Sequence, residues 1–207
     1  MSARATRARQ PASERRKEVL AAATVEFAET GLAGTRLEAI AARTGISHPR
    51  IVQMFGTKRA LFLGVIESVF DQIETAFALA APAAAARDVS ALVALGNAYR
   101  HLLERDRAVG LVMLQGYAAA ADDEVRKLVS HRYRQLQRTV TALTSADAKA
   151  VRSFFATGLV FTVSTVLELP DRRADTEWAG WLLAQSDAQH QGGKVRTSSA
   201  ASSGAAR

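Results

Sequence analysis

The spacing of apolar residues along the chain is helical almost throughout. Leu20, Ala23 and Phe27 fall on one stripe of a first helix that we expect from about residue 13 to residue 30. Gly31 should end this helix, because glycine readily takes the left-handed conformation found just past a helix end. No convincing run has the period of a strand with hairpin turns, so the pattern predicts an all-α protein.

Two short helices joined at a glycine are expected next, over residues 37–44 and 48–55. Thr35 and Glu38 have the spacing of a capping box at the start of the first of these helices. Ser47 is a favourable N-cap for the second. Together the two helices have the spacing of a helix-turn-helix.

The rest of the chain predicts a larger helical bundle. A long helix is expected from Lys58 to about Leu79, with Thr57 as its N-cap and Pro82 just past its end. Further helices are expected near residues 88–105, 108–118, 122–143, 146–168 and 172–185, with Asp122 and Ser145 as N-caps. The pattern therefore predicts about nine helices in total.

These elements divide the chain into four parts. Residues 1–13 should form a disordered basic arm, and residues 14–58 a three-helix domain that contains the helix-turn-helix. Residues 59–185 should form the larger bundle, and the Gly- and Ser-rich residues 186–207 a flexible tail.

Charge is distributed unevenly over these parts. The net charge is +7, and the first 59 residues hold eleven Lys and Arg residues against five Glu residues. A basic N-terminal segment on a nearly neutral body indicates a polyanionic partner.

The composition argues against several other kinds of site. The absence of cysteine excludes disulfides, zinc fingers and thiol catalysis. None of the four histidines has metal-binding spacing, and no phosphate loop or dinucleotide fingerprint occurs, so we expect no enzyme, metal or cofactor. The longest apolar stretch, Ser153 to Leu167, is shorter than the roughly 18–20 residues that span a bilayer. With no visible secretory signal, a cytoplasmic location without a membrane partner is expected.

The helix expected over residues 48–55 has two different sides. Ile51 and Phe55 lie four residues apart and should point inward. The opposite side consists of Pro49, Arg50, Gln53 and Met54. A recognition helix presents such a side to the major groove, but a solvated helix has the same appearance, and Met54 fits the core equally well.

Arg50 can bind guanine through two hydrogen bonds, and Gln53 can bind adenine in the same way. His48, near the helix start, can reach a base or a phosphate, or act only as a surface residue. The residues expected to contact bases are His48, Pro49, Arg50 and Gln53. The residues expected to contact phosphates, together with the basic arm, are Arg36, Ser47, Thr57 and Lys58.

The stretch from Arg16 to Phe62 resembles the N-terminal domain of TetR-family regulators. The matching residues are Ile40-Ala41, Gly45-Ile46-Ser47, Phe55, Thr57-Lys58 and Leu61-Phe62. The resemblance implies that Pro49, Arg50 and Gln53 face bases. Val52 departs from the pattern, because the family usually has a tyrosine there whose hydroxyl bonds a phosphate.

The resemblance also implies a homodimer that pairs through its last two long helices and reads a near-palindromic DNA operator. The residues expected at the dimer interface are Phe154, Phe155, Gly158, Leu159, Val166, Trp178 and Trp181. The helix over residues 146–168 is apolar on nearly every side, and it fits equally well as the central helix of one protomer.

By the same resemblance, the body should hold a small-molecule effector, of unknown identity, in a mostly apolar pocket. The residues expected to line this pocket are Phe70, Phe77, Tyr99, Met113, Gln115, Tyr117 and Phe161. For each aromatic residue among them, ordinary core packing is the alternative that the pattern favours more.

The sequence therefore favours a sequence-specific DNA-binding transcriptional regulator, in the form of a repressor that a small molecule releases from its operator. Two other functions stay open. One is a non-specific DNA-binding protein, and the other is a helical ligand-binding protein whose DNA-binding domain is impaired, as Val52 indicates.

Overall fold

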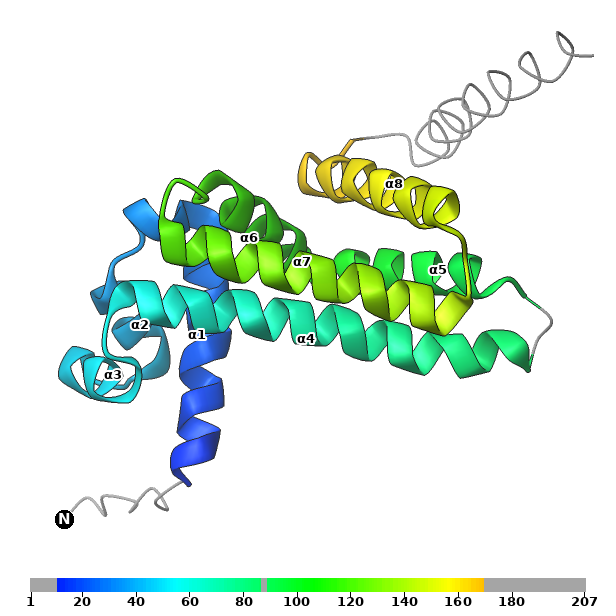
Figure 1. Cartoon of the computed structure of the whole chain (residues 1–207). Coiled ribbons are helices and arrows are strands. Elements are labelled where there is room, and N and C mark those ends of the chain that lie inside the picture. The colour runs from blue at the N-terminus through cyan, green and yellow to red at the C-terminus, as the bar shows by residue number, and fades with distance from the viewer. Residues whose placement is uncertain (1–10, 87–88, 170–207) are drawn as a thin grey trace, which may run out of the picture.

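The computed structural model describes residues 11–86 and 89–169, and every regular element within them is a helix. Figure 1 shows their arrangement. The helices are α1 (Ala12–Gly34), α2 (Leu37–Thr44), α3 (His48–Phe55), α4 (Lys58–Ala85), α5 (Ala91–Arg105), α6 (Arg107–Ala118), α7 (Asp123–Thr144) and α8 (Ala148–Val166). The all-α prediction is confirmed, and the ninth expected helix, over 172–185, lies outside the described residues.

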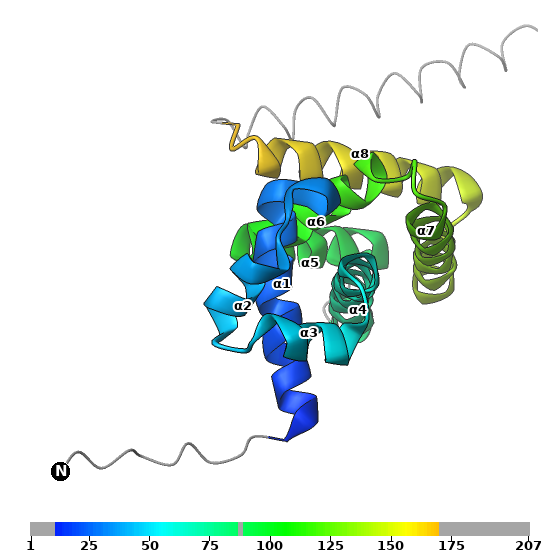
Figure 2. The same cartoon turned by 90° about the vertical axis from the view of Figure 1, so that its left-hand side faces the viewer.

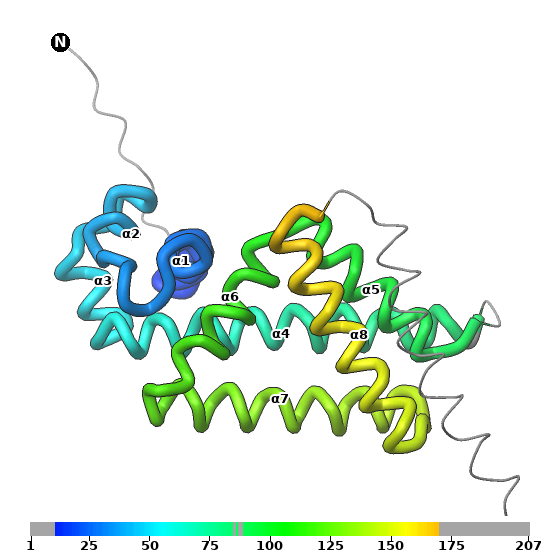
Figure 3. Tube along the Cα trace, turned by 90° about the horizontal axis from the view of Figure 1, so that it is seen from above, coloured from blue at the N-terminus to red at the C-terminus, as the bar shows by residue number. Residues whose placement is uncertain are grey.

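Two groups of helices meet along α1 and α4. Helices α1 to α3 gather at one end of the molecule, the end that faces the viewer in Figure 2. Helix α4 runs the length of the body beside α7, and α8 crosses over them in the view of Figure 3. None of the helices in the described ranges has the length and apolarity needed to cross a membrane.

The two groups share one apolar core. Phe27 of α1 and Phe62 of α4 are both fully buried, with ring centroids 4.9 Å apart. Val19 and Val65 are buried in the same cluster. The stripe that predicted α1 is therefore the face that packs on α4.

Gly31 has φ +66° and ψ −178°, outside the helical region. The predicted break is therefore present, although a further helical turn carries α1 on to Gly34. A Cβ added at Gly31 would lie 2.5 Å from the Oε1 atom of Gln115 in α6. Glycine at this position thus permits both the backbone conformation and the close approach of α6.

The predicted capping box at the start of α2 is wrong. Thr35 is buried, and its hydroxyl donates to the Gly31 carbonyl oxygen at 2.7 Å instead of accepting from an amide of α2. The N-cap residue is Arg36, which makes no capping bond with its side chain. Because Thr35 packs against the end of α1, its hydroxyl forms a hydrogen bond there and not with α2, where the local pattern had predicted one.

Two other boundaries differ from the prediction. Helix α4 continues through Pro82, which is exposed in the last turn, to Ala85. Residue 78, whose carbonyl loses its partner, is exposed too, so water can replace the missing bond. Ser145 takes a left-handed conformation after α7 with φ 53°, and Asp147 caps α8 by accepting from the Ala150 amide at 2.8 Å.

Candidate nucleic-acid interface and body cavity

Helix α3 turns a polar side to solvent at the end of the molecule. Ile51 and Phe55 are only 1% and 9% exposed and fix its inner side in the core. Pro49, Arg50 and Gln53 are exposed, whereas Met54 is half-buried against the core. The described residues thus leave the Arg50 and Gln53 side accessible to a partner.

Arg16 of α1 holds the C-terminal end of α3, a contact that the sequence did not reveal. Its Nη1 donates to the Met54 carbonyl at 2.8 Å, and its guanidinium lies 4.2 Å from the centroid of the Phe55 ring. This satisfies one of the carbonyls that a helix end leaves without a partner. Arg16 and Met54 are 38 positions apart in the sequence, so no local pattern indicated the contact.

The polar groups of α3 pair with one another and with α2. Arg50 Nη1 donates to Gln53 Oε1 at 2.5 Å, and His48 Nδ1 lies 3.2 Å from the Glu38 carboxylate. Both pairs are exposed or half-exposed, so their separation costs little in water. These side chains can therefore break their present contacts and form hydrogen bonds with a ligand instead.

The four residues expected at phosphates lie at the three turns before α2, between α2 and α3, and after α3. Arg36 and Ser47 are exposed, and the Ser47 hydroxyl makes no capping bond to α3. Thr57 caps α4 by accepting from the Ala60 amide at 3.0 Å. Lys58 Nζ donates to the carbonyls of Ala33 and Thr35, which leaves one of its three donors.

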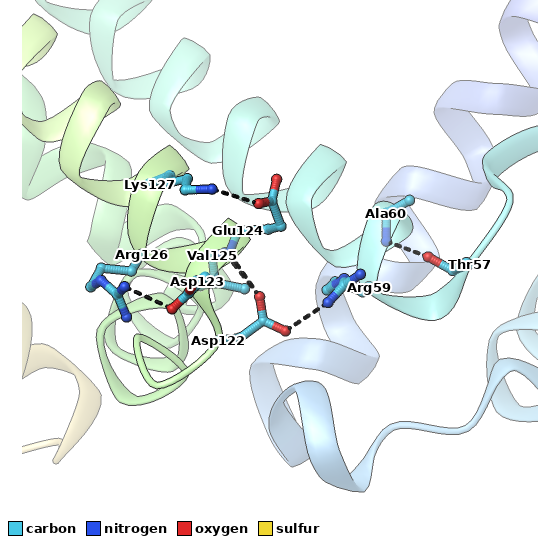
Figure 4. A network of polar contacts seen from close by, with 9 residues as sticks. All are labelled: Thr57, Arg59, Ala60, Asp122, Asp123, Glu124, Val125, Arg126 and Lys127. Atoms are coloured by element: carbon cyan, nitrogen blue, oxygen red, sulfur yellow. Dashed lines mark hydrogen bonds and ion pairs between the residues drawn. The ribbon is translucent and has the colours of Figure 1, made fainter.

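A charged contact joins the first turn of α4 to the start of α7, as Figure 4 shows. Asp122 Oδ1 accepts from the amides of Glu124 and Val125 at 3.0 and 3.2 Å, so Asp122 caps α7 as predicted. Its Oδ2 lies 3.2 Å from Arg59 Nη1. The Val125 amide first, then Arg59 and the Glu124 amide, lower the pKa of the Asp122 carboxyl.

We expect Asp122→Ala to lower the melting temperature at pH 7 more than at acid pH. Because the folded carboxyl has a lower pKa than the unfolded one, its stabilisation is complete above the ordinary carboxyl pKa of about 4 and is lost below it. Thermal melts between neutral pH and about pH 3 measure this. Asp123→Ala, at an exposed ion pair, is the control, and an equal pH dependence in both variants would contradict the prediction.

The body encloses a cavity of about 590 Å³ between α4, α5, α6, α7 and α8. Its walls are mainly aromatic and aliphatic. The lining residues are Ile73, Phe77, Tyr99, Met113, Tyr117, Val129, Ser130, Tyr133, Arg134, Leu136, Phe154, Phe155, Gly158, Leu159 and Thr162. Ser130, Arg134 and Leu159 are exposed, and they mark a mouth between α7 and α8.

Of the seven residues expected at a pocket, Phe77, Tyr99, Met113 and Tyr117 line this cavity. Phe70, Gln115 and Phe161 do not. Phe70 is buried under Arg132, whose guanidinium lies 5.6 Å from the ring centroid. Gln115 faces α1, where its Nε2 donates to the Ala28 carbonyl at 3.5 Å, and Phe161 is half-buried against the core.

Several residues expected at a dimer interface face the interior of this protomer instead. Phe154, Phe155 and Gly158 line the cavity, because α8 turns this side toward α5 and α7. Val166 is buried, and its Cγ2 would lie 3.2 Å from a Cβ added at Gly110. Leu159 is 49% exposed and is the most accessible of these described residues for contact with a partner. Trp178 and Trp181 lie outside the described residues.

The phenols of the cavity are held in their neutral form. Burial raises the pKa of Tyr99, Tyr117 and Tyr133, most of all by desolvation. Tyr99 and Tyr133 raise the pKa of Tyr117 further, so the three groups lie close enough to interact. Each therefore keeps its proton at neutral pH and can donate it in a hydrogen bond.

The N-terminal helices are similar to a family of bacterial regulatory proteins. Residues 19–65 match the model described as bacterial regulatory proteins of the TetR family. Over 59 residues, the chain is 37% identical to the HTH-type transcriptional regulator RutR of Escherichia coli K12. That match spans only 28% of this chain and 28% of RutR.

The fold is similar, over most of the chain, to solved structures of low sequence identity. A TetR-like transcriptional regulator from Rhodococcus sp. RHA1 has a TM-score of 0.65 at 21% identity, over 87% of this chain and 99% of that one. The transcriptional regulator FadR from Bacillus subtilis, in complex with stearoyl-CoA, has a TM-score of 0.64 at 14% identity, over 81% and 95% of the two chains.

Proposed function

We propose that this chain, which carries the N-terminal domain of the TetR family, is a sequence-specific DNA-binding transcriptional regulator. It acts as a homodimer on a near-palindromic operator, because two-fold pairing doubles the contacts that one small domain can make. The observation that carries the proposal is α3, whose Ile51 and Phe55 are buried while Arg50 and Gln53 face solvent.

We expect Arg50→Ala to reduce binding to the operator by about 1–3 kcal/mol and to relax specificity at one base pair. The physical reason is that the variant loses the two guanidinium N–H donors that can hydrogen-bond to the edge of a guanine base. Fluorescence anisotropy measures this with a palindromic duplex from the promoter region of the protein's own operon and with variants of each base pair. Arg36→Ala is the matched control, which should weaken all duplexes alike and lower the salt dependence.

Three outcomes would contradict the proposal in different ways. Equal binding of wild-type protein to operator and scrambled duplexes would indicate non-specific DNA binding instead. Binding to no duplex would indicate an impaired DNA-binding domain, which the 38% exposed Val52 in the middle of α3 would explain. An equal loss on every duplex for Arg50→Ala would remove its base-reading role.

The cavity supports a ligand-controlled form of this function. Its 590 Å³ suit a small molecule, and FadR, which shares the fold, binds stearoyl-CoA. Helix α6 contributes Met113 and Tyr117 to the cavity and turns Gln115 toward α1. A ligand that binds one arrangement of α6 better than another therefore changes the position of the DNA-binding helices, and DNA changes ligand affinity by the same factor.

A further inference from the structure

The donors and acceptors in the cavity wall indicate what kind of ligand it takes. Among the lining residues in the described part of the chain, none is acidic and one, Arg134, is cationic. Asp71 and Glu74 are not among the lining residues, and their carboxylates lie 2.7 and 3.4 Å from Arg132 Nη2 between α4 and α7. The other oxygen of Glu74, Oε1, is buried without a hydrogen-bond partner among the described residues. The cavity thus offers nothing that would neutralise a cationic ligand by charge.

The proton of Tyr99 is already committed. Thr162 Oγ1 lies 2.7 Å from the Tyr99 hydroxyl and donates its only proton to the Gly158 carbonyl at 2.8 Å. Tyr99 must therefore be the donor to Thr162. This pair leaves no hydroxyl proton for a ligand, so it acts as a fixed part of the wall.

The other phenols are free to donate. The hydroxyls of Tyr117 and Tyr133 make no hydrogen bond with the described residues, although both side chains line the cavity. Ser130, Tyr133 and Arg134 lie at positions i, i+3 and i+4 on one side of α7. Arg134 uses only its Nε, which donates to the Ser130 carbonyl at 3.0 Å. This side of the cavity is therefore rich in unused N–H and O–H donors.

Aromatic walls can also attract a cation, but here their arrangement opposes it. Phe77 meets Tyr99 and Phe154 edge to face, and Phe155 meets Phe154 and Tyr133 in the same way. The rings thus cover part of one another's negative faces, which are what a cation would bind. Arg134 adds a like charge at the mouth.

We infer that the cavity takes a hydrophobic carboxylate, with its apolar body between the aromatic walls and its carboxylate oxygens accepting from Tyr117, Tyr133 and Arg134. The inference rests on the proposed function in treating this cavity as the effector site. Charge-assisted bonds from a guanidinium favour a carboxylate over a neutral oxygen. The apolar body supplies most of the affinity, and the donors supply the choice of head group.

Three probes with the same ten-carbon chain test the head group by isothermal titration calorimetry on the full-length protein. They are decanoate, decan-1-ol and decyltrimethylammonium. Decanoate is expected to bind about tenfold more tightly than decyltrimethylammonium, with decan-1-ol between them. Equal or tighter binding of the ammonium probe, or no binding of decanoate, overturns the inference.

Variants locate the effect in the cavity. Arg134→Gln should weaken the binding of decanoate by about five- to tenfold and change the binding of decan-1-ol by less than about twofold. The reason is that the exposed guanidinium attracts the negative charge of the carboxylate, which decan-1-ol lacks. Arg138→Gln, exposed one turn further along α7 and outside the cavity lining, is the control and should change neither. The two variants Tyr117→Phe and Tyr133→Phe should each weaken the binding of both decanoate and decan-1-ol. An equal loss of both probes in Arg134→Gln contradicts the charge role.

Anisotropy with the operator duplex separates this inference from the proposed function. Specific DNA binding without selective decanoate binding removes the ligand class and leaves the regulator. Selective decanoate binding without DNA binding supports the ligand class and removes the regulator. Release of the duplex by decanoate, absent in Arg134→Gln at the same concentration, supports both.

Discussion

Replacing Phe62 by alanine is expected to lower the free energy of unfolding by about 3–5 kcal/mol, the cost of a large cavity in a packed core. Phe62 is fully buried in the first turns of α4, and its ring lies 4.9 Å from that of Phe27 in α1. The contact joins α1, which packs on α2, to the body. Urea denaturation followed by circular dichroism measures the loss, and Leu79→Ala, 71% exposed in the same helix, is the control.

A double-mutant cycle shows whether the two rings act together. Phe27→Ala should cost a similar amount, and the double variant should cost less than the sum, because the rings contribute about 0.5–1.5 kcal/mol through their mutual contact. Losses that add fully would mean that the rings stabilise the core independently. A loss below about 1 kcal/mol for Phe62→Ala would mean that the core refills the space.

The second large effect is expected at Gly31. Gly31→Ala should lower the free energy of unfolding by about 2–4 kcal/mol, because a side chain is strained at φ +66° and ψ −178°. Its Cβ would also lie 2.5 Å from Gln115 Oε1. Denaturant melts measure the loss.

Gly64→Ala is the matched control for this substitution. Gly64 lies within α4, and a Cβ there would meet only Leu20 Cδ2 at 3.4 Å, so the change should be neutral or slightly stabilising. Combining Gly31→Ala with Gln115→Ala removes the steric contact but leaves the backbone strain. If the double variant regained the full stability of the wild-type protein, the steric contact with Gln115 and not the backbone conformation would account for the lost free energy of unfolding.

The short helices could be predicted from the sequence because their signals are local. Residues 37–44 and 48–55 have the bounds that were expected, since Gly45 takes the left-handed conformation after α2, although the Ser47 hydroxyl makes no capping bond to α3. Thr35 and Pro82 show the limit of such signals. The Thr35 hydroxyl donates its hydrogen bond to the Gly31 carbonyl and does not cap α2. Helix α4 continues through Pro82 because the turn that the proline disrupts is exposed to water. Both outcomes depend on which neighbours the tertiary fold provides.

In the candidate site, too, the sequence predicted the local features but not the contacts between distant segments. The inward position of Ile51 and Phe55 follows from spacing, whereas Arg16 reaches α3 across 38 residues of sequence. Phe70 and Phe77 lie two turns apart on one side of α4, yet only Phe77 reaches the cavity. Period alone does not say how far along a helix a cavity extends, because that depends on where α7 and α8 diverge from their neighbours.

Leu159 lies at the mouth of the cavity and is also half-exposed on the outer surface of α8, where Val163 and Leu167 follow it at helical spacing. A molecule that covers this surface of α8 therefore narrows the entrance as well. For the proposed homodimer and effector, assembly and ligand exchange would therefore compete for this one edge. A ligand would enter and leave a lone protomer faster than a covered one, and its residence time would depend on protein concentration.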